Sequence, residues 1–280
     1  MIGKASGIPL VSVIIPAYNH ERFIGAAVAS VLEQSLDDFE LIVIDDGSTD
    51  RTGEIVKSQS DPRLTYIYQD NQDAPATINR GLNLARGRFI AILNSDDLYH
   101  KKRLERLVAV QAASGAACLF TDLDMIDENG GPLAATAFLP WWLECKRQFY
   151  REHHDLFASL ISGNIMVTTS NLFMTAEAAQ RVGPFARERY CHDYDYILRM
   201  ILTWPGQVHY LIGEKLLAYR LHGGNTIHES RALSVEQERD LLYRTMLTYL
   251  PDDKRLAMAE VLIRLVSLHS WLQNNQATRH

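Results

Sequence analysis

Two aspartates stand side by side where an apolar stretch of the chain ends. The stretch RFIAILNSDD begins at Arg88, has the composition of a buried strand over its first seven residues, and closes with Asp96 and Asp97. Burying unpaired carboxylates costs several kcal/mol, roughly, so such groups face water or hold a cation. Mg²⁺ and Mn²⁺ favour carboxylate and phosphate oxygens as ligands. The pair therefore predicts a divalent-cation site, with Asp97 as the ligand, that neutralises a diphosphate.

Polar residues also follow two other apolar runs. Tyr18 and Asn19 come after LVSVII, and Asp45 and Asp46 close the run in FELIVIDD. In a parallel sheet the carboxyl ends of the strands meet at one edge, where ligands bind. We therefore expect these residues and the aspartate pair to share one site.

Strand-like and helix-like segments alternate over the first half of the chain. The expected strands are 10–15, 39–48, 63–69, 88–94 and 117–127. The expected helices are 21–34, 49–60, 75–87 and 100–115. Such alternation predicts the α/β class, with a mostly parallel sheet and helices on both of its faces.

The second half is less regular. A strand and a short helix are expected within 167–185, a helix within 190–200, strands at 207–212 and 215–222, and largely helical structure over 229–272. We predict one domain over 1–226, with a nucleotide-binding half at about 10–127 and an acceptor half at about 128–226. A helical extension over 227–280 is expected to follow it.

Composition narrows the choice of partners. The net charge is −6 and the pI is near 5.9, so we expect no nucleic-acid partner. The chain contains no apolar stretch of the roughly eighteen residues that a membrane span requires, and its N-terminus does not look like a secretory signal. A cytoplasmic protein is expected, with peripheral contact at the inner membrane face left open.

The segment from Phe138 to His154 mixes aromatic and basic residues. Such a mixture suits an acceptor groove or a membrane-surface contact. The alternative is that its aromatic residues belong to the core and its charges are merely solvated.

The sequence lacks the motifs of two other kinds of nucleotide-binding site. No G-x-G-x-x-G follows the first strand, where PAYNHERF stands instead, and no G-x-x-x-x-G-K-[ST] occurs. A bound nucleotide would therefore need another way to neutralise its phosphates.

Several motifs, taken in order, resemble those of the inverting family 2 glycosyltransferases with the GT-A fold. They are VSVIIPAYN, SVLEQSLDDFELIVIDDGSTD, GLNLARGRFIAILNSDDLY, CHDYDYILRM and YRLHGGNT, and they span about residues 10 to 226. The resemblance implies transfer of a sugar from a nucleotide-diphosphate donor to a hydroxyl acceptor. It also implies Mn²⁺ or Mg²⁺ as cofactor and an acceptor that is often a lipid-linked surface glycan.

The resemblance also implies roles for single residues. Asp96 would lie near the ribose or sugar, Asp97 on the metal, and His222 at the metal or the diphosphate, while Asp193 would be the general base. The residues expected to hold the donor nucleotide are Pro16, Tyr18, Asn19, Asp46 and Asn79. Because Asp46 would accept a hydrogen bond from a pyrimidine, UDP is the first choice of nucleotide and dTDP the second.

Two positions depart from the family pattern. Ile78 stands where relatives often carry an arginine, which puts one nucleotide contact in doubt. His192 replaces a common glutamate before the base.

Other interpretations remain open at this point. Asp45 and Asp46 could cap the following helix, Tyr18 could be a half-buried aromatic residue, and Asp195 competes with Asp193 for the role of base. At the level of function, the alternatives are a nucleotidyltransferase and a catalytically silent sugar-binding module of the same fold.

Overall fold

The computed structural model describes residues 7–135, 137–225 and 231–249. The chain divides into two compact units, residues 1–229 and 230–280. Within the second unit only helix α9, Arg231–Tyr249, is described, and it is helical as expected. The rest of the predicted extension, including its start at 227, lies outside the described residues.

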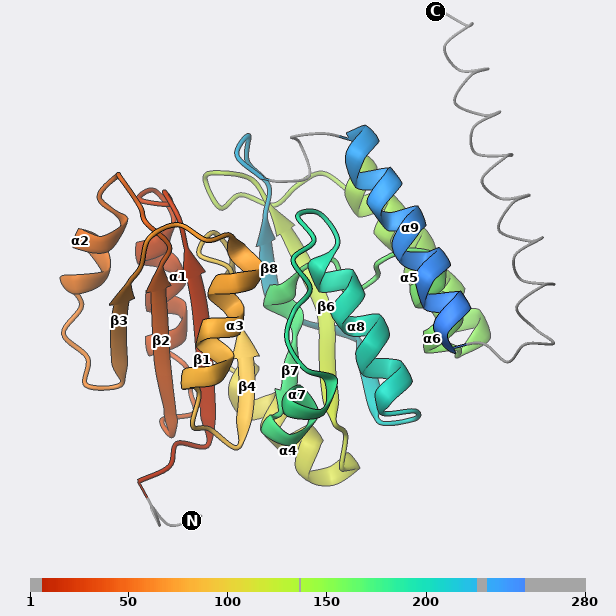
Figure 1. The fold of residues 1–280 in the computed structure, drawn as a ribbon, viewed down its shortest axis with the longest axis horizontal. Coiled ribbons are helices and arrows are strands. Elements are labelled where there is room, and N and C mark those ends of the chain that lie inside the picture. The colour runs from red at the N-terminus through yellow and green to blue at the C-terminus, as the bar shows by residue number, and fades with distance from the viewer. Residues whose placement is uncertain (1–6, 136, 226–230, 250–280) are drawn as a thin grey trace, which may run out of the picture. The chain divides into compact units, whose positions relative to one another are not determined.

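The first unit is built on an eight-stranded sheet in the order β3-β2-β1-β4-β7-β6-β8-β5 (Figure 1). Its strands are β1 Val11–Ala17, β2 Phe39–Asp45, β3 Leu64–Tyr68, β4 Phe89–Ile92, β5 Leu98–Tyr99, β6 Cys118–Ile126, β7 Phe173–Thr175 and β8 Val208–Arg220. The pairs β1–β2, β2–β3, β1–β4 and β6–β8 are parallel. Strand β7 runs antiparallel to β4 and β6, and β5 runs antiparallel to β8. The mixed, mostly parallel sheet confirms the predicted fold class.

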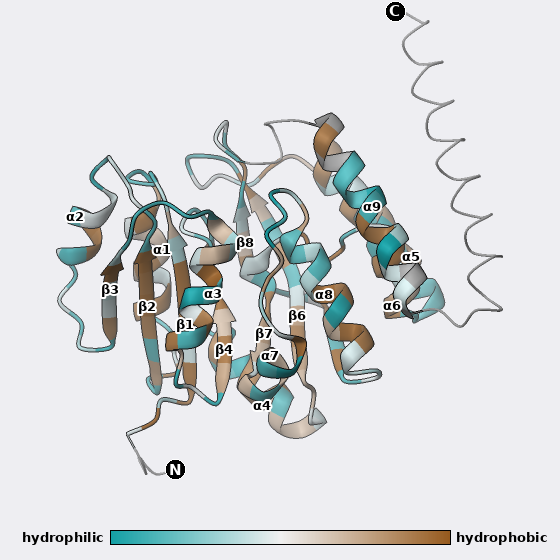
Figure 2. Cartoon of the chain, in the orientation of Figure 1, coloured by the Kyte–Doolittle hydropathy of each residue, from teal (hydrophilic) through white to brown (hydrophobic). Residues whose placement is uncertain are grey.

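Helices flank this sheet. They are α1 Ile24–Leu32, α2 Thr52–Lys57, α3 Ala74–Leu84, α4 Arg103–Ser114, α5 Phe138–His153, α6 Leu156–Ile161, α7 Ala176–Val182 and α8 His192–Thr203, with a 3₁₀ turn, η1, at Thr169–Asn171. Figure 2 shows strands that are largely apolar between helices whose outer faces are hydrophilic.

Strand β1 is covered on both faces because its side chains alternate. Val11, Val13 and Ile15 share a core with α1. On the other face α3 approaches closely, since a Cβ added to Gly81 would lie 2.4 Å from Ile14 Cγ2. Burial of both faces explains why this strand is a continuous apolar run.

The structure corrects the prediction in the second half of the chain. Residues 208–220 form one strand, β8, where two strands were expected. Gly213, whose φ is +86°, falls between the two expected strands but lies within this strand, where its N–H donates to Asp122 Oδ2 at 2.6 Å. The pairing with β6 shifts register at Asp122, so an irregularity absorbs the glycine and the strand continues.

Candidate active site

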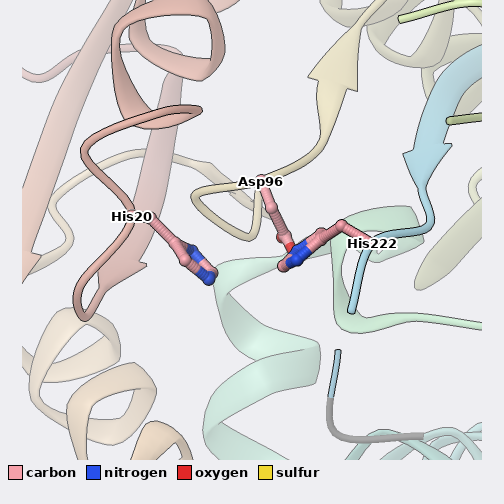
Figure 3. Close-up of side chains that lie close together, drawn as sticks. All are labelled: His20, Asp96 and His222. Atoms are coloured by element: carbon pink, nitrogen blue, oxygen red, sulfur yellow. The ribbon is translucent and has the colours of Figure 1, made fainter. Parts of the chain in front are cut away.

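Three loops meet at the carboxyl edge of the sheet and bring together two histidines and an aspartate. His20 follows β1, Asp96 lies between β4 and β5, and His222 follows β8, and Figure 3 shows their side chains converging. One ligand atom from each lies within 4.8 Å of the other two. His222 Nε2 is 3.0 Å from Asp96 Oδ2, and these two side chains are only 7% and 11% exposed. We call this group the His–Asp–His cluster.

Neighbouring polar groups orient the cluster. Ser95 Oγ lies 2.6 Å from His20 Nδ1, and Asn225 donates from Nδ2 to Asp96 Oδ2 at 3.3 Å. Asn225 also accepts the His222 backbone N–H through Oδ1 at 2.6 Å. Burial lowers the pKa of His20, which favours the neutral ring that a metal ligand needs. Two imidazoles and a carboxylate form a donor set that fits a first-row divalent ion.

Asp97 lies apart from the cluster in a buried site of its own. Its Oδ2 accepts from Ser170 Oγ at 2.6 Å and its Oδ1 from the Arg220 backbone N–H at 2.9 Å. The side chain is fully buried, and desolvation, followed by repulsion from Asp96, raises the pKa of this carboxyl well above its usual range. Both Asp97 oxygens thus accept hydrogen bonds, one from η1 and one from the end of β8, and the metal role of Asp97 stays a prediction.

The two aspartates that end β2 are also engaged within the protein. Asp46 is 3% exposed, and its carboxylate accepts from Gln69 Nε2 at 2.5 Å and from the backbone N–H groups of Gln72 and Asp73. Asp45 accepts from the Ser48 N–H at 2.9 Å and from the Tyr66 hydroxyl, but it does not cap α2, whose N-cap is Arg51. Asp46 Oδ1 thus accepts two hydrogen bonds and Oδ2 one, so a base contact would use the remaining acceptor site on Oδ2.

The other residues predicted to hold the donor nucleotide differ in their surroundings. Tyr18 is 48% exposed at the strand edge. Asn19, at a φ of 50°, ties two loops together by accepting the Thr49 N–H at 2.8 Å. Pro16 lies inside β1, opposite Ile44.

Asn79 latches α3 onto the segment that leads to α8. Its side chain donates to the Phe185 carbonyl at 2.9 Å and accepts the Phe185 N–H at 2.7 Å. Beside it lies a polar hollow of about 410 Å³, lined by Gln69, Gln72, Ala76, Asn79, Arg80, Asn83 and Arg187. Ile78, where an arginine was expected, is fully buried, while Arg80 donates to Gln69 Oε1 at 2.7 Å. The guanidinium of Arg80 therefore contacts Gln69, the hydrogen-bond partner of Asp46, from a different position of the helix.

Asp193 lies in the first turn of α8 and keeps part of its surface accessible. Burial raises the pKa of this carboxyl, while the neighbouring His192 and a hydrogen bond from Asn164 Nδ2 at 3.2 Å oppose the rise. Tyr219 is close enough to Asp96, Asp97 and Asp193 for all three to raise its pKa, after the larger effect of burial. Asp193 and the cluster therefore border the same region.

Asp195 has a different partner. Its Oδ2 pairs with Arg199 at 2.7 Å one turn further along α8. This i,i+4 ion pair gives Asp195 a structural role.

Helix α5 carries the aromatic and basic residues of the predicted acceptor segment. Phe138 and Trp141 are 65% and 57% exposed at its start. Arg147, in contrast, is buried and pairs through Nε with Asp122 Oδ1 at 2.8 Å, which fastens the helix to β6. Among the described residues, no helix is long and apolar enough to cross a membrane.

The sequence did not single out His20, Ser170, Arg220 or Asn225. His20 stands in PAYNHERF directly after the first strand, so its place at a strand end was an available signal. Arg220 and Asn225 stand in YRLHGGNT, from which only His222 was singled out, and Ser170 is revealed only by its contact with Asp97, 73 positions away.

The mostly parallel sheet gathers histidine and carboxylate side chains at its carboxyl edge, which is the arrangement expected of a GT-A glycosyltransferase. The model of Glycosyl transferase family 2 matches residues 12–168, more than half of the sequence, and the chain belongs to this family.

Relatives extend over most of the chain. A Nostoc protein named as an uncharacterized glycosyltransferase is 29% identical over 234 residues, which cover 81% of this chain and 70% of that protein. The putative teichuronic acid biosynthesis glycosyltransferase TuaG of Bacillus subtilis is 38% identical over 128 residues, 45% of this chain and 51% of its own.

Solved structures share the fold. S. aureus TarS in complex with UDP-GlcNAc has a TM-score of 0.67 at 19% identity, covering 88% of this chain and 69% of its own. The mannosyltransferase PcManGT from Pyrobaculum calidifontis, in complex with GDP-Man and Mn²⁺, has a TM-score of 0.58 at 16% identity, covering 95% and 80%.

Proposed function

We propose that this family 2 glycosyltransferase moves a sugar, with inversion, from a nucleotide-diphosphate donor, UDP-sugar first, to a hydroxyl of a surface glycan. The observation that carries the proposal is the His–Asp–His cluster, which gathers three possible cation ligands at the carboxyl edge of the sheet. The cluster offers ligands for a cation that binds a diphosphate, and Asp193, in the first turn of α8, offers a base for an acceptor.

Asp193 takes the acceptor proton in this mechanism. The acceptor oxygen forms a bond to the anomeric carbon, the bond from that carbon to the diphosphate oxygen breaks, and the nucleoside diphosphate leaves with the electron pair. Attack opposite the leaving group inverts the configuration. Asn164 holds the carboxylate in place through its 3.2 Å hydrogen bond, and general-base catalysis of this kind is worth roughly 10² to 10⁴ in rate.

Asp96 and His222 hold the cation in this proposal, in place of the predicted Asp97. Both point into the cluster, whereas the Asp97 oxygens face donors inside the protein. A bound Mn²⁺ or Mg²⁺ supplies Lewis-acid stabilisation of the leaving diphosphate.

Release of nucleoside diphosphate from a panel of nucleotide sugars with Mn²⁺ tests the activity. Asp193→Asn should lower turnover by about 10² to 10⁴ while leaving nucleotide affinity nearly unchanged. Asp195→Asn is the matched control on the same helix, and a much smaller loss is expected for it. A retained anomeric configuration in the NMR spectrum of the product, or an active Asp193→Asn enzyme, refutes this base. Donor binding without any turnover would favour a sugar-binding module instead.

The acceptor in this proposal is a lipid-linked glycan, met at the membrane surface by the exposed start of α5. Phe138 and Trp141 supply the amphipathic contact. Binding to anionic liposomes should fall on Trp141→Ala, and unchanged sedimentation refutes the contact. Arg147 is unsuitable for this test because it is a buried structural residue.

A further inference from the structure

His20 is held in one orientation by its neighbours. Its Nδ1 lies 2.6 Å from Ser95 Oγ, and its ring stands edge-on to the rings of Phe23 and His222, with centroids 5.9 and 5.6 Å away. Among the described residues, no hydrogen bond is formed by Nε2, the ring nitrogen left over. Figure 3 shows the ring directed at Asp96 and His222 from the opposite side of the site. A positioned imidazole with one nitrogen to spare is the arrangement of a metal ligand with an outer-shell partner.

The separations within the cluster suit a single ion. Ligand atoms bound to one small divalent ion lie roughly 3 to 4 Å apart, given metal–ligand bonds of about 2.1 Å. The cluster atoms lie within 4.8 Å of one another, and the closest pair is at 3.0 Å. Closing the site on an ion therefore needs shifts of about 1 Å or less, which side-chain rotation can supply.

The chemistry of these ligands selects among metals. Magnesium prefers oxygen ligands, whereas imidazole nitrogen favours first-row transition ions. With one imidazole and one carboxylate, an octahedral ion would depend on donor phosphates for much of its binding. With a second imidazole it gains a third protein ligand and keeps open positions for phosphate oxygens.

We propose that His20 is a third protein ligand, so that the site takes up a first-row transition ion before the donor binds and prefers it to Mg²⁺. This inference rests on the proposed function only for the identity of the later partner, the diphosphate. The ion itself needs no nucleotide.

Uptake of the ion requires a small rearrangement at His222. Its Nδ1 accepts the Gly224 N–H at 3.2 Å, so the neutral ring carries its proton on Nε2 and donates it to Asp96. For Nε2 to bind an ion, the ring would carry its proton on Nδ1 instead, and the Gly224 N–H would lose this acceptor.

Calorimetric titration of Mn²⁺, Co²⁺ and Mg²⁺ into metal-stripped, full-length enzyme without nucleotide tests the proposal. The expected result is one Mn²⁺ per chain, a preference for Mn²⁺ and Co²⁺ over Mg²⁺, and about tenfold or greater weakening of Mn²⁺ by His20→Ala. His20→Gln, which offers an oxygen, should narrow the preference for Mn²⁺ over Mg²⁺. His153→Ala, at an exposed histidine on α5 outside the cluster, is the matched control and should bind as wild type does.

Controls distinguish a loss of metal binding from misfolding and from a loss of transferase activity. Circular dichroism checks that each variant is folded, and Ser95→Ala provides a milder variant that only releases Nδ1 and should weaken Mn²⁺ less than His20→Ala. Wild-type enzyme that binds no Mn²⁺ without nucleotide, or a folded His20→Ala enzyme that binds it as wild type does, overturns the proposal. Intact Mn²⁺ binding without glycosyl transfer instead refutes the proposed function alone.

Discussion

Substitution of Asp96 should weaken metal binding, whereas substitution of Asp97 should lower the stability of the fold. Asp96 faces the cluster, where His222 and Asn225 are its partners. Asp96→Asn keeps the volume of the side chain but removes the charge, so it should weaken Mn²⁺ by about tenfold or more while changing stability little. Asp97 should behave as a structural residue, because its carboxylate is enclosed by donors from η1 and β8.

The cost of losing Asp97 follows from those donors. Asp97→Ala leaves the Ser170 hydroxyl and the Arg220 N–H, now bonded at 2.6 and 2.9 Å, without an acceptor. Each buried donor left unsatisfied costs about 1 to 3 kcal/mol, so the free energy of unfolding should fall by roughly 2 to 6 kcal/mol. At about 2 to 4 °C per kcal/mol, Tm should fall by roughly 4 to 24 °C. Asp97→Asn retains an acceptor for the Arg220 N–H, so its free energy of unfolding should fall by less.

The assay combines thermal unfolding of the full-length protein with Mn²⁺ calorimetry at a temperature where every variant is folded. The isosteric Asp97→Asn enzyme should retain most of its Mn²⁺ affinity, and Asp96→Asn should not. If folded Asp97→Asn loses the ion while Asp96→Asn keeps it, the assignment of the two carboxylates is reversed and the reasoning from their partners fails.

Three further predictions concern other contacts. Because burial raises the pKa of Asp193, activity in a pH–rate profile should rise with pH around a pKa above that of an ordinary aspartate. Asn164→Leu should move this rise to higher pH, since it removes a hydrogen bond that favours the ionised carboxylate. Arg147→Ala breaks a buried ion pair and should cost about 3 to 5 kcal/mol in urea unfolding. Gly81→Ala forces a Cβ to within 2.4 Å of Ile14 and should cost about 1 to 3 kcal/mol by the same method.

Much of the first half was predictable because its signals are local. Strand β1 is apolar on both faces, and α3 begins with a capping aspartate, Asp73, followed by a proline. Strand β5 was harder to predict, since it has only two residues, Leu98–Tyr99, and depends wholly on pairing with β8. No local pattern specifies so short a strand.

The sequence predicted the edge of the sheet at which the site lies, but not the surroundings of its individual residues. Polar residues at strand ends predicted where the functional groups gather, whereas neither the burial of Asp97 nor the three hydrogen bonds that Asp46 accepts could be read from neighbouring residues. Both depend on donors elsewhere, such as Arg220, which is 123 positions from Asp97. Adjacent aspartates look equivalent in a sequence, and only their long-range partners distinguish them.

Those long separations have a consequence for the order of folding. Asp96 is 126 positions from His222, and the Asp97 carboxylate is closed by residues 73 and 123 positions away. Contacts of such range form late, after the chain entropy of closing the intervening loops has been lost. A nascent chain that has made β1 to β4 already holds His20 and Asp96, but it lacks the third member of the cluster until β8 has docked. The proposed metal site is therefore complete only when the sheet is complete, so metal affinity in a refolding experiment should report the last stage of assembly rather than the first.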